Sequence, residues 1–168
     1  MSVNDEVVHG IPTNTRRIEE GDIVSLDAGV IYEGYHSDAA RTHGVGKISK
    51  ESEQLIAVTR QSFFEGIKMA VAGNHLHDIS AAIQKYAESY GFSIVRDLVG
   101  HGIGTKLHEE PQIPNFKPVG RGPKLRPGMT LAIEPMVNAW DWKIWILEDD
   151  WTVLTRDASN SAYLWIAA

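Results

Sequence analysis

The sequence contains no cysteine, which excludes disulfide bonds and any metal site built from thiolates. Basic charge is also scarce: 16 Lys and Arg stand against 22 Asp and Glu, and the net charge of −6 argues against general nucleic-acid binding. No stretch approaches the roughly 18 consecutive apolar residues of a membrane span. The first residues, Met1 to Glu6, lack the basic and apolar regions of a signal peptide. We therefore expect a cytoplasmic protein that does not enter membranes.

The remaining composition is that of a folded domain. With 168 residues, 43% of them hydrophobic, the chain predicts a single domain over residues 1–168. Short apolar runs, with a hairpin break at Glu33-Gly34, precede two helical patterns, and further short runs follow. The predicted strands are 6–9, 22–31, 35–45, 92–99, 129–137, 143–147 and 151–155, and the predicted helices are 49–73 and 76–90. Strands on both sides of a helical block indicate an α+β fold.

Two aspartates interrupt the strands of the predicted hairpin. If the chain turns at Glu33-Gly34, Asp38 lies opposite Gly29, and Asp27 is its diagonal neighbour on the same face. Two carboxylates that close together repel each other unless a cation lies between them. The alternative is one surface acid beside a turn and one acid in a salt bridge.

Other polar side chains occur where charge is costly to bury. His101 stands between two glycines after an apolar run, His108 follows seven residues later, and Glu134 interrupts a predicted strand before Pro135. His9 ends the first strand. Two Asp, one His and one Glu suit Mn, Fe or Co better than a structural zinc, and bridging carboxylates indicate two ions. The remaining histidines are interpreted as structural or surface residues: His36, His43, His75 and His77.

At this point the sequence resembles the type I methionine aminopeptidases, which have the pita-bread fold. The segments that carry the resemblance are 2–12, 22–27, 34–38, Gly100-His101-Gly102-Ile103-Gly104, His108-Glu109-Glu110-Pro111, 126–130 and Ile133-Glu134-Pro135-Met136. The resemblance implies a mixed, mostly antiparallel sheet with two helices packed on it. It also implies that the family's N-terminal segment is missing and that the C-terminus is altered.

The resemblance further implies a dinuclear metal hydrolase that removes the N-terminal methionine of nascent peptides. Asp27, Asp38, His101 and Glu134 look like metal ligands, with Glu134 also carrying the proton. His108 looks like the group that stabilises the oxyanion, His9 like the group that positions the substrate, and Trp151 like a wall of the methionine pocket. Trp165 stands where the family has a bridging glutamate, and no Asp, Glu or His follows Asp157.

Two other interpretations stay open. The five tryptophans all lie in the last 29 residues, so the chain could be an impaired or engineered scaffold that binds a protein partner through this region. Alternatively, the tryptophans simply fill core space. A proline dipeptidase on the same fold is a further option, although the His-Gly-Ile-Pro and His-Glu-Glu-Pro segments favour the methionine enzyme.

Overall fold

A nine-stranded sheet forms the centre of the protein. The computed structural model describes residues 1–167, so Ala168, the last residue of the predicted domain, lies outside the described residues. The main path of the sheet runs β1 (Ser2–Val3), β3 (Ile23–Tyr32), β4 (Tyr35–Gly44), β12 (Ser161–Ala167), β8 (Leu131–Ile133), β6 (Gly100–Gly102) and β7 (Glu109–Ile113). From β12 it branches to β9 (Met136–Asn138) and β5 (Ser93–Ile94). A second sheet contains β10 (Ile144–Ile146), β11 (Val153–Thr155) and β2 (Glu6–Val8). All strand pairs among the described residues are antiparallel, so the sheet is more uniform than the mixed one expected.

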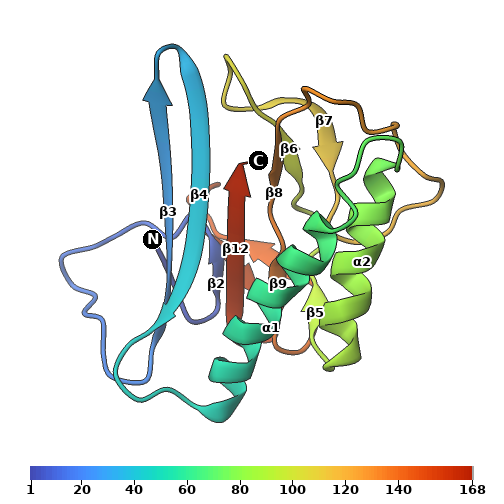
Figure 1. The fold of residues 1–168 in the computed structure, drawn as a ribbon. Coiled ribbons are helices and arrows are strands. Elements are labelled where there is room, and N and C mark those ends of the chain that lie inside the picture. The colour runs from blue at the N-terminus through green and yellow to red at the C-terminus, as the bar shows by residue number, and fades with distance from the viewer. Residues whose placement is uncertain (168) are drawn as a thin grey trace.

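Two helices cover one face of the large sheet (Figure 1). Helix α1 (Lys50–Ile67) begins at Ser49, whose hydroxyl accepts the Ser52 N–H at 3.0 Å. Helix α2 (Leu76–Ser89) begins at His75, whose N–H is accepted by the Asp78 carboxylate at 2.8 Å. The prediction that the first helix continues to Gly73 is wrong. After Ile67 the N–H groups of residues 69 and 70 bond to carbonyls three residues earlier, which tightens the chain into turns.

Apolar side chains pack on both faces of the large sheet. On one face, Leu55 and Ile83 of the helices pack in one cluster with Ile133 and Leu164 of the central strands. On the other face, Trp165 packs in a separate cluster that includes Val8 and Val153 of the small sheet. The large sheet is therefore a middle layer, with helices on one side and the three-stranded sheet on the other. Neither helix among residues 1–167 is long and apolar enough to cross a membrane.

The strands predicted after the two helices differ from those of the structure. The strand predicted at 129–137 is two strands, β8 and β9, separated by Glu134-Pro135. Proline has no N–H to donate to a neighbouring strand, so the ladder is interrupted there. The predicted strand 92–99 is reduced to β5, and β7 was not predicted because Glu109-Glu110-Pro111 carries no alternating apolar pattern.

The tryptophans do not form a common core. Trp140, Trp145 and Trp151 are more than half exposed, which contradicts the interpretation that they fill core space. Trp142 is partly buried beneath the Arg96 guanidinium, 4.8 Å from the ring centroid. Trp165 alone among the five is buried, at 4% exposure.

Candidate metal centre

The register of the β3–β4 hairpin positions the two aspartates as predicted. The turn lies at Glu33-Gly34, Asp38 faces Gly29, and Asp27 faces Ala40. Directly paired residues of antiparallel strands point to the same side, and residues two apart share a face. Asp27 and Asp38 therefore point to the same side of the sheet.

The same reasoning extends across the central strands. Trp165 of β12 faces Ala40 of β4. On the other side of β12, Tyr163 pairs with Met136 and Ile166 pairs with Ile133, so Trp165 is in register with Glu134.

His101 of β6 joins this face through Ala132, its partner on β8, which lies two residues before Glu134. Strand register alone thus brings five side chains from five segments to one face of the sheet: Asp27, Asp38, His101, Glu134 and Trp165.

Three of these side chains form a compact buried group that could hold a metal ion. Asp38, His101 and Glu134 each offer a ligand atom, and these atoms lie within 4.8 Å of one another. His101 Nε2 lies 2.9 Å from Glu134 Oε1 and 3.9 Å from Asp38 Oδ2. One imidazole and two carboxylates form the nitrogen and oxygen set that suits Mn, Fe or Co.

The orientation of the ring and the carboxylate fits a cation. The Nδ1 atom of His101 lies 2.8 Å from the Gly102 carbonyl oxygen, so in the neutral ring Nδ1 carries the proton and Nε2 presents its lone pair to the group. Glu134 is 7% exposed, and its Oε1 makes no well-aligned hydrogen bond to any described residue despite its closeness to His101. A buried carboxylate oxygen left without such a bond is costly, and a bound cation would satisfy it.

In the absence of a cation, the pKa values of Glu134, His101 and Asp27 are all raised. Burial raises the pKa of Glu134, an effect that the neighbouring His101 only partly offsets. Burial tends to lower the pKa of His101, but contacts with Glu134, the Gly102 carbonyl and Asp38 raise it overall. Loss of solvent and the nearby Asp38 carboxylate raise the pKa of Asp27 to about 6. Burial is the largest cause for both Glu134 and Asp27, and the Asp38 carboxylate adds to it; a divalent cation would favour the ionised forms of these carboxylates.

Trp165 contacts this group through Asp38. Its indole Nε1–H donates to Asp38 Oδ1 at 3.1 Å, and its ring stacks on Tyr163 with centroids 4.6 Å apart. The side chain that replaces the expected glutamate is therefore bonded to one of the candidate ligands.

The remaining predicted residues line one cavity together with this group. His9, which follows β2, stacks on Trp151 with ring centroids 4.6 Å apart. His108 meets His101 edge to face at 4.3 Å, and loss of solvent together with His101 lowers its pKa. Burial similarly lowers the pKa of His9. Both imidazoles are therefore neutral near pH 7.

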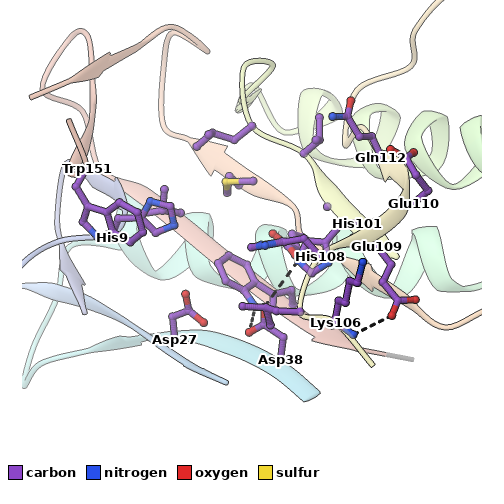
Figure 2. Close-up of a pocket in the computed structure, with 18 residues that line it drawn as sticks. His9, Asp27, Asp38, His101, Lys106, His108, Glu109, Glu110, Gln112 and Trp151 are labelled. Carbon is purple, nitrogen blue, oxygen red and sulfur yellow. Dashed lines mark hydrogen bonds and ion pairs between the residues drawn. The ribbon is translucent and has the colours of Figure 1, made fainter. Parts of the chain in front are cut away.

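All the residues singled out in the sequence line one cavity of about 970 Å³: His9, Asp27, Asp38, His101, His108, Glu134, Trp151 and Trp165. Figure 2 shows Asp27 and Asp38 along one wall, His101 and His108 near the middle, and the stacked His9–Trp151 pair at one end. Sequence reasoning missed Leu98, Lys106 and Gln112, which also line the cavity. Their one signal was their closeness in sequence to His101 and His108.

The chain as a whole is similar to known metallopeptidases. The model of metallopeptidase family M24 matches residues 1–155. A methionine aminopeptidase of Clostridium perfringens is 56% identical over 97% of this chain, and the chain spans 65% of that relative's length. The crystal structure of the Thermotoga maritima methionine aminopeptidase is 49% identical, with a TM-score of 0.95 over 99% of this chain and 67% of that chain. A prolidase from Pyrococcus furiosus, 21% identical with a TM-score of 0.71 over 99% of this chain and 44% of its own, shares the fold.

Proposed function

This chain belongs to metallopeptidase family M24, and on that premise we propose that it is a metal-dependent aminopeptidase that removes the N-terminal methionine of nascent peptides. The observation that carries the proposal is the buried group of Asp38, His101 and Glu134, whose ligand atoms converge beside a cavity of about 970 Å³. A cavity of this size accommodates the end of a peptide. The likeness to methionine aminopeptidases over nearly the whole chain supports methionine as the residue removed.

The donor set fits a divalent ion, with Mn, Fe or Co favoured by the carboxylates and the single imidazole. When bound, such an ion supplies Lewis acidity to a peptide carbonyl and acidifies water. Asp38 and His101 would hold it, together with Glu134. The resemblance also assigns a second ion to Asp27 and Asp38, and the position of Trp165 bears directly on that ion.

The chain's own side chains account for the remaining chemistry. Glu134, whose pKa is raised by burial, accepts a proton from the attacking water and returns it to the leaving amine. His108, at the cavity wall, donates a hydrogen bond to the carbonyl oxygen as negative charge develops there. His9 orients the peptide backbone, and the half-exposed ring of Trp151 covers the methionine side chain.

The proposal is tested by methionine release from a Met-Ala-Ser tripeptide in the presence of Mn²⁺ or Co²⁺. We expect release that chelation abolishes and that His101→Ala reduces by at least 100-fold, because the ion loses its nitrogen ligand. His43→Ala is the matched control, since His43 is exposed on β4 outside the cavity. Equal loss in both variants, or release unaffected by chelation, would contradict the assignment.

A second candidate function rests on the exposed tryptophans. Trp145 and Trp151 are 55% and 56% exposed, and the intervening Ile146 is 61% exposed. Large exposed aromatic side chains are typical of binding surfaces, so the alternative is a binding or structural module with a protein partner. If this alternative is right, peptidase activity appears only in the Trp165→Glu variant. Robust peptidase activity of the unaltered chain would exclude the binding-module function.

The proposal extends to organisation and location. We infer that residues 1–168 act as one catalytic domain, and that an enzyme for nascent peptides works in the cytoplasm. Fluorescence microscopy of the tagged protein tests the second point.

A further inference from the structure

The indole of Trp165 engages the one carboxylate that a two-ion site would have to share. Its N–H donates to Asp38 Oδ1 at 3.1 Å, with both side chains buried. Indole offers a hydrogen-bond donor and no lone pair for a metal. Trp165 therefore contributes no ligand, and it directs the positive end of the N–H bond at an oxygen that a cation would otherwise use.

The other oxygen of Asp38 lies beside His101. Asp38 Oδ2 is directed toward His101, whose Nε2 lies 3.9 Å away and is also 2.9 Å from Glu134 Oε1. The compact group of possible ligands contains Asp38, His101 and Glu134 and does not include Asp27. One position thus has three donors, of which one is a buried carboxylate oxygen without a well-aligned hydrogen bond.

A second ion beside Asp27 would have a much poorer environment. Its protein ligands would be Asp27 and Asp38 Oδ1, and that Asp38 oxygen already accepts a hydrogen bond from the Trp165 indole N–H. Catalytic zinc sites have three protein ligands, and two carboxylates alone fall short of that number. The ring itself is fixed in place by the stack on Tyr163, with an angle of 16° between the ring planes.

We propose that Trp165 makes this a one-ion site, in which Asp38, His101 and Glu134 hold a single divalent ion and the position beside Asp27 stays free of metal. The inference rests on the metal binding of the proposed function and departs from the two ions that the resemblance implies. It assigns Trp165 the role of excluding the second ion, through the ligand it fails to supply and the hydrogen bond it makes.

The test is the stoichiometry of Mn²⁺ binding, measured by isothermal titration calorimetry and by equilibrium dialysis of the full chain. We expect one ion per chain in the unaltered protein and two in Trp165→Glu, in which a carboxylate replaces the indole. Trp145→Glu is the matched control, because it adds the same charge at an exposed tryptophan under Arg156, outside the cavity. It should bind one ion.

Trp165→Phe covers the case in which the buried glutamate prevents folding. Phenylalanine keeps an aromatic ring and supplies no oxygen, so one ion is again expected, with circular dichroism confirming the fold. Co²⁺ binding should also quench tryptophan fluorescence in the unaltered chain, with saturation at one equivalent, and quench less in Trp165→Phe.

The outcomes separate the two proposals. Two ions in the unaltered chain or in Trp165→Phe overturn the one-ion inference and leave the metallopeptidase proposal standing. Absence of any bound ion in a folded chain overturns the metal site itself, and both proposals with it. A folded Trp165→Glu that binds only one ion also overturns the role given to Trp165.

Discussion

The glycine before His101 should be essential for the geometry of the metal centre, and Gly100→Ala tests this. A Cβ atom at position 100 would lie 2.2 Å from the backbone carbonyl oxygen of Ala132 and 3.5 Å from Glu134 Cγ. Carbon and oxygen atoms in close contact are normally about 3.3–3.6 Å apart, so the overlap exceeds roughly 1 Å. The clashing atom belongs to strand β8, so relief requires movement of a backbone rather than rotation of a side chain.

The cost of this movement can be bounded. Overpacking of a well-packed interior costs about 1–3 kcal/mol, and a clash with backbone should fall near the upper end. For a domain of this size each kcal/mol lowers Tm by roughly 2–4 °C, so we expect a loss of about 6–12 °C. Because His101 and Ala132 are paired, separation of β6 from β8 also moves His101 away from Glu134, and Mn²⁺ affinity should fall at least tenfold.

Thermal unfolding in EDTA, followed by circular dichroism, measures the first effect, and calorimetric Mn²⁺ titration measures the second. Gly29→Ala is the matched control, because a Cβ atom there meets only the Ser37 carbonyl oxygen at an ordinary 3.8 Å. If Gly100→Ala is as stable as Gly29→Ala and binds Mn²⁺ as tightly as the unaltered chain, the reasoning from close backbone approach is refuted.

Three further predictions concern the charge, the metal and the core. The pKa of Asp27 is raised from 3.8 to about 6, so ionised Asp27 lowers the free energy of unfolding above that pH. Asp27→Asn should therefore raise the Tm of the metal-free protein at about pH 8, and this gain should vanish below about pH 4. A gain in Tm that does not change with pH would count against the reasoning. Mn²⁺ at 100 times its Kd should add about 2.7 kcal/mol of stability in calorimetric scans, and none in His101→Ala. Leu55→Ala, at a fully buried position of α1, should cost about 2–5 kcal/mol in urea unfolding, against less than about 0.5 kcal/mol for the fully exposed Val119→Ala.

Local features of the sequence were sufficient for much of the fold. The two-residue break at Glu33-Gly34 determined the hairpin register, and with it the common face of Asp27 and Asp38, because a one-residue slip would reverse every side chain. Ser49 marked the start of α1 correctly. The end of α1 and the interruption at Glu134-Pro135 were missed, because turn-tightening bonds and loss of a ladder bond leave no trace in apolar periodicity.

The identity of the candidate site residues could be read from the sequence, but apart from the Asp27–Asp38 pair their relation in space could not. His101 and Glu134 meet because β6 pairs with β8 and β8 with β12, an order set by packing between segments far apart in the chain. The sequence alone placed a tryptophan where a glutamate was expected. Only the tertiary structure decided that this tryptophan bonds to Asp38, 127 residues away, because that contact depends on the register of β4 against β12.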